Sequence, residues 1–301
     1  MKERLTLMMC FKPHIFIKGK RYFEVNDIKY VGFILVSWRV HRVLGKLLCS
    51  FHSNEIDRLI DCPRGCRSLE SHDSSRYDVD TLERLVILIK RKYGDEGLCY
   101  FVLHHYLDRL VDILASLISN YYESYALGYS ASKMSFEEIY EHIRTEAFES
   151  LQIDPKNILT LLVYDLTSVL NALYWMYGGK RKRRQRRHFE EVLEKAYTRI
   201  SSNSNLQQLR NIVLEVLRNI RDNIDCVIYA TLIDEGFKSK GTLNKIAAVL
   251  QVKVAKYRYY ARMRGSYYDE LANKLLDEEN IIRFIGGIVE ASHNRCNLLS
   301  R

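Results

Sequence analysis

The scarcity of residues that interrupt regular structure is the feature that most constrains the fold of this chain. Only three prolines and fourteen glycines occur among its 301 residues. A many-stranded β protein needs turn residues about every 8 to 12 positions, which is more than this composition offers. Because 47% of the residues are apolar and 28% are charged, the composition is that of a folded globular protein. We therefore predict a mainly α, multi-helical fold.

Hydrophobic periodicity and capping residues place the expected elements. One short β-hairpin is expected at residues 14–25, where apolar and polar residues alternate around Lys18-Gly19-Lys20. Ser135 and Glu138 form a predicted capping box at the start of another helix. After a first helix within 30–51, helices are expected at about 81–93, 98–123, 136–151, 206–222, 224–235, 242–250, 254–264, 267–277 and 279–291.

Polar loops and one basic run divide the chain into four predicted regions. Residues 1–77 hold the hairpin, a helical segment and a candidate zinc module, and residues 78–179 form a helical block. A basic linker at 180–188 leads to a second helical block, 189–301, which carries a C-terminal helix-turn-helix. The length of the chain suits two such blocks, each with its own core.

Many of the basic residues are concentrated in two segments that contain no acidic residue. Residues 180–187 (KRKRRQRR) hold seven basic residues, and residues 238–264 hold eight. These fifteen belong to a total of 46 lysines and arginines against 37 acidic residues, so the rest of the chain has an excess of acids despite a net charge of +9. Dense basic segments of this kind are typical of surfaces that bind a polyanion, either nucleic acid or an anionic membrane.

The cysteines and the apolar segments favour an intracellular protein. Seven cysteines are scattered along the chain, which is unlike a small disulfide framework and predicts a reducing compartment. The apolar run near the first residues is too short for a secretory signal. Residues 158–177 are long enough to span a bilayer, but Asp165 and Asn171 near their centre favour a buried core helix instead. We expect a cytoplasmic protein, or a nuclear one if the source is a eukaryote.

Residues 243–262 (LNKIAAVLQVKVAKYRYYAR) have the apolar spacing of a helix-turn-helix, with the turn at Gln251. The expected packing positions are Ile246, Ala247, Leu250, Val252, Tyr257 and Tyr260. The second helix would present its basic side chains to phosphates and base edges. The alternative is a helix pair in a larger bundle with a solvated basic face. The predicted DNA-binding residues are Lys245, Lys253, Lys256, Arg258, Arg262 and Arg264.

The segment 226–263 resembles the end of the second cyclin-type repeat of archaeal transcription factor B and its relatives. The resemblance lies in an Ala- and Tyr-rich helix (IYATLI), a threonine-led helix (TLNKIAAVL) and a basic helix with alternating aromatics (VAKYRYYARM). It implies that Lys256, Arg258 and Arg262 contact promoter DNA. The paired Cys-x-x-Cys knuckles of that family's zinc ribbon are absent from this sequence.

The first basic segment resembles the arginine-rich segments by which some viral proteins bind RNA or enter nuclei. Its predicted nucleic-acid backbone contacts are Lys180, Arg181, Lys182, Arg183, Arg184, Arg186 and Arg187. A solvated linker is the alternative interpretation. The spacing of Arg183 and His188 also resembles the Arg-x4-His pair of certain helical ribonucleases, which gives an enzymatic alternative.

A zinc site is a weaker hypothesis for the N-terminal region. Cys49, His52, Cys62 and Cys66 could supply four tetrahedral ligands, although buried thiols explain the same residues. Two further sets share one face of a helix at spacings of four residues, and either could bind a metal or form an ordinary charged stripe. The two sets are His104, Asp108 and Asp112, and Glu138, His142 and Glu146.

These observations predict a nucleic-acid-binding protein, with a transcription-related helix-turn-helix factor favoured over an enzyme. DNA is favoured over RNA as the partner, protein partners in transcription are a further expectation, and membrane association is not expected. Zinc is the one cofactor considered. The alternatives are a helical RNA-processing or toxin-like ribonuclease and a viral structural protein that packages nucleic acid.

Overall fold

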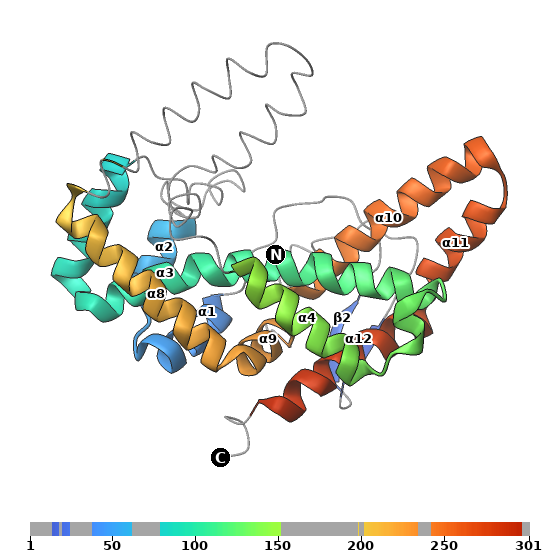
Figure 1. Cartoon of the computed structure of the whole chain (residues 1–301), viewed down its shortest axis with the longest axis horizontal. Coiled ribbons are helices and arrows are strands. Elements are labelled where there is room, and N and C mark those ends of the chain that lie inside the picture. The colour runs from blue at the N-terminus through green and yellow to red at the C-terminus, as the bar shows by residue number, and fades with distance from the viewer. Residues whose placement is uncertain are drawn as a thin grey trace, which may run out of the picture. The chain divides into compact units, whose positions relative to one another are not determined.

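The computed structural model of the chain describes residues 14–17, 20–24, 38–61, 79–151, 198, 202–233 and 242–296 (Figure 1). These residues are mainly helical, which confirms the predicted fold class. Two short strands, β1 (His14–Ile17) and β2 (Lys20–Glu24), pair in antiparallel fashion. The hairpin as a whole stays a prediction, because its turn and the side chains of both strands lie outside the described residues.

The helices of the described ranges follow one another through most of the chain. Short connections separate several of them, and the 3-10 helix η2 (Ser130–Lys133) lies between α3 and α4. The α-helices are α1 (Trp38–Cys49), α2 (Asn54–Asp61), α3 (Val79–Ala126), α4 (Phe136–Leu151), α8 (Ser204–Asp222), α9 (Ile224–Leu232), α10 (Thr242–Arg264), α11 (Tyr267–Leu275) and α12 (Glu278–Arg295).

Local geometry confirms two of the predicted helix boundaries. Gly94 has a φ of 71° inside α3 and separates two helical stretches, as expected from the helices predicted at 81–93 and 98–123. The Ser135 hydroxyl accepts a hydrogen bond from the Glu138 N–H at 3.2 Å, and a Glu138 carboxylate oxygen accepts one from the Ser135 N–H at 2.8 Å. This reciprocal pair is the predicted capping box.

The predicted break at Gln251 is wrong. α10 is one continuous helix from Thr242 to Arg264, so the helices predicted at 242–250 and 254–264 are joined and form no helix-turn-helix there. The residues around Gln251 (VLQVKVA) include none of the Gly, Pro, Asn or Asp residues that favour a turn, and glutamine is itself a good helix former. Val252, expected to pack between the two helices, is 64% exposed.

Packing groups the described residues into two compact units. Unit 1 takes its described residues from within Met1–Leu44, Leu107–Leu151 and Ile220–Arg301, and unit 2 takes its own from within Gly45–Tyr106 and Gln152–Asn219. Each unit therefore combines stretches that are distant in sequence. The predicted region boundaries at residues 77, 179 and 188 lie outside the described residues.

The core of unit 1 lies between α4, α9 and α12. Phe284 of α12 is fully buried, with its ring centroid 5.5 Å from that of Tyr122, 5.3 Å from Tyr125 and 6.1 Å from Phe136. Asp225 at the start of α9 accepts a hydrogen bond from the Tyr140 hydroxyl at 2.7 Å. An aromatic core with paired polar groups at its edge holds these helices together.

The core of unit 2 lies among α2, the first part of α3 and α8. Ile56, Ile60, Val86 and Ile89 are at most 1% exposed. At the edge of this core, the Gln208 amide of α8 donates a hydrogen bond to Asp95 at 2.8 Å. Long-range apolar contacts supply most of the stability of such short helices, because isolated helices of this length are marginal in water.

Two disulfides join described residues, whereas the sequence favoured free thiols. Cys49 and Cys99 are bonded in unit 2 with an S–S distance of 2.05 Å, and Cys226 and Cys296 in unit 1 with 2.00 Å. The bonded partners are 50 and 70 residues apart in sequence. Cysteine spacing alone does not determine such pairings, since seven cysteines can combine in many ways.

Within the described ranges, no helix combines the length and the hydrophobicity that crossing a membrane requires. The apolar segment 158–177 lies outside those ranges.

Candidate nucleic-acid interface

The candidate interface lies on unit 1, where α10 ends and α11 begins. Gly265 has a φ of 105°, a conformation that favours glycine, and its N–H donates to the Ala261 carbonyl at 2.9 Å. The chain then reverses, and α11 packs along the second half of α10 (Figure 1). The helical hairpin formed by Val252–Leu275 is called the α10–α11 hairpin below.

Tyrosines connect the two helices of the α10–α11 hairpin. The ring centroid of Tyr268 lies 6.4 Å from that of Tyr257, 5.7 Å from Tyr260 and 5.5 Å from Tyr267. Tyr259 stands at the edge of this cluster, 5.9 Å from Tyr260. Aromatic pairs at such separations are worth about 0.5 to 1.5 kcal/mol each beyond area burial, so the cluster holds the tip of the hairpin in one arrangement.

Lys245 and Lys253, two of the six predicted DNA-binding residues, are bound to carboxylates of α3. Lys245 forms an ion pair with Asp112, and its side chain is only 14% exposed. Lys253 pairs with Glu123 and also donates to the Asn120 side-chain oxygen at 2.9 Å. These lysines attach α10 to α3 within unit 1 and are not available to a ligand.

Glu123 is held as a carboxylate by its two partners on α10. Burial alone would raise the pKa of Glu123, but hydrogen bonds from Lys253 and Tyr257, together with the positive charges of Lys253 and Lys256, outweigh that effect and lower the pKa below its usual value. The Tyr257 hydroxyl donates to Glu123 at 2.7 Å, and burial together with this carboxylate raises the pKa of Tyr257. Glu123 is therefore ionised at neutral pH, and each of its carboxylate oxygens accepts a hydrogen bond from α10.

The other four predicted DNA-binding residues are exposed on the α10–α11 hairpin: Lys256, Arg258, Arg262 and Arg264. None of the four forms an ion pair with another described residue of the chain. The Arg264 guanidinium lies over the Tyr260 ring, 5.7 Å from its centroid. Of the nearby acidic residues on α11, Glu270 is paired with Lys274 at 3.0 Å. The hairpin thus retains four cations that can bind an anionic ligand.

An exposed apolar stripe runs between these cations. Val252, Tyr259 and Met263 are 64%, 60% and 70% exposed, and Tyr267 on α11 is 59% exposed. Residues three and four apart lie on one face of a helix, so Lys256 falls within the same stripe on α10. Large apolar side chains gathered on one exposed face, next to unpaired cations, are typical of a binding surface.

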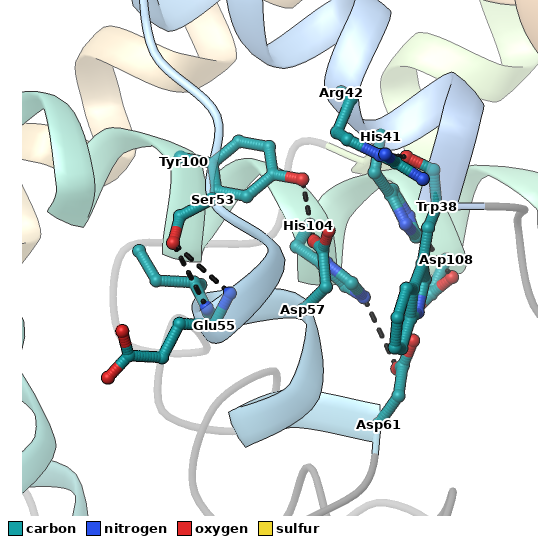
Figure 2. Close-up of polar contacts among 11 residues, drawn as sticks. Trp38, His41, Arg42, Ser53, Glu55, Asp57, Asp61, Tyr100, His104 and Asp108 are labelled. Atoms are coloured by element: carbon teal, nitrogen blue, oxygen red, sulfur yellow. Dashed lines mark hydrogen bonds and ion pairs between the residues drawn. The ribbon is translucent and has the colours of Figure 1, made fainter.

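A buried polar cluster in unit 2 combines residues that the sequence did not group (Figure 2). The His104 ring lies between two carboxylates of α2, with Nδ1 3.1 Å from Asp57 Oδ1 and Nε2 3.3 Å from Asp61 Oδ1. The Tyr100 hydroxyl donates to Asp57 Oδ1 at 2.6 Å. The four residues of this cluster are each at most 2% exposed: Asp57, Asp61, Tyr100 and His104.

The geometry of this cluster favours a structural role over metal binding. The two carboxylates face opposite edges of the imidazole, so their oxygens and the ring nitrogens do not converge on one point. His104 lies within hydrogen-bonding distance of both carboxylates, so removing one member of this buried set would leave a polar group without its partner. Asp57 and Asp61 directly follow Ile56 and Ile60, and this spacing was a signal that both acids lie beside the buried face of α2.

The two histidine sets singled out in the sequence are divided among different partners. The contacts of His104 in the first set are given above. Of the other two members, Asp108 lies 3.5 Å from His41 Nε2, and Asp112 is paired with Lys245. In the second set, Glu138 caps α4, His142 stacks on Tyr121 at a centroid distance of 6.2 Å, and Glu146 accepts from the Tyr121 hydroxyl at 2.7 Å. The members of each set therefore have different contacts, and metal binding by either set stays a prediction.

Of the four residues of the predicted zinc site, the structure describes Cys49 and His52. Cys49 is bonded to Cys99, and a sulfur in that bond is not a thiolate ligand. His52 Nδ1 is buried without a hydrogen-bond partner among the described residues. Cys62 and Cys66 lie outside the described residues, so the zinc site stays a prediction.

The basic segment 180–187, His188 and most of the surrounding chain also lie outside the described residues. The predicted backbone contacts and the ribonuclease alternative therefore stay predictions. No protein-family model matches the chain, and no curated protein or solved structure is significantly similar to it.

Proposed function

We propose that this protein binds nucleic acid through the α10–α11 hairpin. The observation that carries the proposal is the separation of the six predicted basic residues into two groups. Lys245 and Lys253 are neutralised by carboxylates of α3, whereas Lys256, Arg258, Arg262 and Arg264 are exposed and free of ion pairs within the described chain. Arginine is suited to phosphate, because its planar fork can donate two hydrogen bonds to one phosphate group.

The proposal does not use a helix-turn-helix. α10 is one continuous helix, so contact with a ligand comes from one exposed face of that helix and from the first turn of α11. The basic segment 180–187 would add electrostatic affinity for the same polyanion. The resemblance of 226–263 to archaeal transcription factor B is the one reason to favour DNA over RNA.

The salt dependence of binding tests this function directly. The affinity of the full-length chain for nucleic acid should fall as salt rises, because binding releases counterions. Replacing Lys256, Arg258, Arg262 and Arg264 by alanine should make the slope of log K against log salt shallower by about 3 to 4, since each lost phosphate contact contributes about 0.7 to 0.9. Fluorescence anisotropy with labelled oligonucleotides at several salt concentrations gives this slope.

The matched control is Lys245→Ala with Lys253→Ala. This variant also loses cations of α10, but both are already paired with carboxylates, so the slope should stay close to that of the unmodified chain. Circular dichroism establishes that each variant is folded. Equal slopes for the unmodified chain and the fourfold variant would contradict the proposed interface.

A further inference from the structure

We propose that the α10–α11 hairpin recognises single-stranded nucleic acid, by stacking its exposed tyrosines on unpaired bases while the flanking cations bind phosphates. This inference rests on the proposed function and specifies its substrate class. It starts from the exposed apolar stripe, which a purely electrostatic phosphate contact leaves unexplained.

Tyr259 is placed to contact a base. Its side chain is 60% exposed, and Lys256 and Arg262 lie three residues before and after it on α10. At a rise of about 1.5 Å per residue, these cations lie about 4.5 Å along the helix axis on either side of the ring. A strand running along this face can therefore place phosphates on the cations and a base against the ring between them.

Tyr267 offers a second aromatic ring at the other side of the turn. It is 59% exposed, while its neighbour Tyr268 packs against Tyr257 and Tyr260. The inner tyrosines thus fix the turn, and the outer ones remain accessible. A ring already held in place loses little conformational freedom on binding, which favours stacking affinity.

The chemistry of the stripe favours unpaired bases over a duplex. In a duplex the base faces are stacked on one another, and the major groove offers mostly donors and acceptors with the thymine methyl as its apolar group. Those base edges require hydrogen-bond donors and acceptors. Among the stripe residues Tyr259, Met263 and Val252, only the phenol hydroxyl of Tyr259 is a good one. Unpaired bases expose apolar faces to which aromatic rings bind with little sequence preference.

The same stripe is a poor membrane anchor. Interfacial helices insert faces that are rich in Trp, Phe and Leu. The exposed large apolar residues of the α10–α11 hairpin are instead Val252, Tyr259, Met263 and Tyr267. Nucleic acid is therefore the polyanion that this surface fits better.

The test compares four ligands with the full-length chain by fluorescence anisotropy. The ligands are oligo(dT), oligo(U), an abasic DNA strand of the same length and a DNA duplex, each of about 12 nucleotides per strand, within the site sizes of single-strand binders. One of the two base-bearing single strands, or both, should bind about five-fold or more tightly than the abasic strand, since one stacked base contributes at least about that factor. Comparison of oligo(dT) with oligo(U) distinguishes DNA from RNA.

Substitutions of Tyr259 separate the contribution of base stacking to the binding affinity from the contribution of charge. Tyr259→Leu should weaken binding of the base-bearing strand about five-fold or more and leave abasic binding unchanged. Tyr259→Phe keeps the aromatic ring and should retain most of the affinity. Because Tyr259 is exposed, both variants should fold, and the comparison of abasic with base-bearing strands in the unmodified chain needs no variant.

The possible failures are distinguishable. If the abasic strand and the duplex bind as tightly as the base-bearing strands, single-strand recognition is overturned. The nucleic-acid function then still stands, provided that the fourfold basic variant has the shallower slope of log K against log salt that is predicted above. If no nucleic acid binds, the proposed function itself fails. Binding only to vesicles containing phosphatidylserine would overturn both proposals in favour of a membrane surface.

Discussion

Glu123 decides which basic residues of α10 can meet a ligand. Its carboxylate accepts hydrogen bonds from both Lys253 and Tyr257, and the carboxylate of Asp112, eleven residues earlier on α3, accepts one from Lys245. These ion pairs neutralise Lys245 and Lys253 on α10. Lys256, Arg258, Arg262 and Arg264 form no ion pair with a described residue. Two carboxylates of α3 therefore determine which basic residues of α10 remain exposed without an ion pair.

The lowered pKa of Glu123 predicts a pH-dependent contribution to stability. Because the folded pKa lies below the usual value of 4.5, the stabilisation is complete above about pH 4.5 and is lost as the pH falls through the folded pKa. Glu123→Gln should lower the free energy of unfolding by about 1 kcal/mol at neutral pH, and the difference from the unmodified chain should shrink at acidic pH. Urea unfolding at both pH values measures this difference.

Glu270→Gln is a suitable control for this measurement. Glu270 is paired with Lys274 on the exposed surface of α11, where such pairs contribute little. Its substitution should change stability only slightly under either condition. A Glu123→Gln deficit that is the same at neutral and acidic pH would show that the loss comes from packing and not from ionisation.

At the scale of elements, α12 carries two adjacent glycines with opposite surroundings. A Cβ atom at Gly287 would lie 2.4 Å from two atoms of the Phe136 ring, whereas a Cβ at Gly286 would meet nothing within 4 Å. Phe136 cannot move freely, because its ring also packs against Tyr125 and Phe284. Gly287 therefore permits the close approach of the start of α4 to α12.

This contrast predicts opposite effects of the same substitution. Gly287→Ala should destabilise unit 1 by about 1 to 3 kcal/mol, as overpacking of a filled core does. Gly286→Ala should be neutral or stabilise by up to about 1 kcal/mol, because alanine is the better helix former. Thermal and urea unfolding of the two variants measure the change in the free energy of unfolding for each substitution. Equal destabilisation by both would contradict the close packing of α4 on α12.

At the scale of the whole molecule, each compact unit contains a long-range disulfide. The Cys49–Cys99 bond lies in unit 2 and the Cys226–Cys296 bond in unit 1. Each closes a loop of 50 or more residues, so each reduces the conformational entropy of the unfolded chain. A chain with these bonds formed depends less on the hydrophobic core alone.

Reduction of these bonds should lower the free energy of unfolding by up to about 4 kcal/mol for each bond. Peptide mapping under non-reducing conditions should recover Cys49 linked to Cys99 and Cys226 linked to Cys296. Unfolding with and without a reductant then measures the effect, and the Cys226→Ser, Cys296→Ser double variant assigns the share of unit 1. Recovery of alkylated Cys99 from the native, unreduced protein would contradict the pairing in unit 2.

Much of the helical architecture was predictable, because it depends on neighbouring residues. Periodicity located α4, α8 and α9 to within a few residues, and the predicted break between residues 93 and 98 and the Ser135 capping box marked helix ends correctly. The error at Gln251 has the same origin. A pattern resemblance suggested a turn, although the local residues favoured a continuous helix, and local propensity prevailed.

The candidate site was predictable only in part. The sequence identified the basic residues of α10, but it did not separate Lys245 and Lys253 from the rest, because their carboxylate partners lie more than 120 residues away. The spacing of His104 indicated only Asp108 and Asp112 on its own helix as neighbours, and it did not indicate the contacts of His104 with Asp57 and Asp61 of α2. Partners on other elements cannot be deduced from spacing along one helix.

The amino-acid sequence by itself determined the helical class and the presence of an acid-free basic segment, since both depend on composition and on contacts within a few residues. Only the tertiary structure decided which four cations remain exposed, which cysteines are joined and which acids enclose His104. The physical reason is that burial, ion pairing and disulfide formation require groups from distant parts of the chain to come within a few ångströms of one another. Tertiary packing creates that proximity, and the local sequence pattern does not determine it.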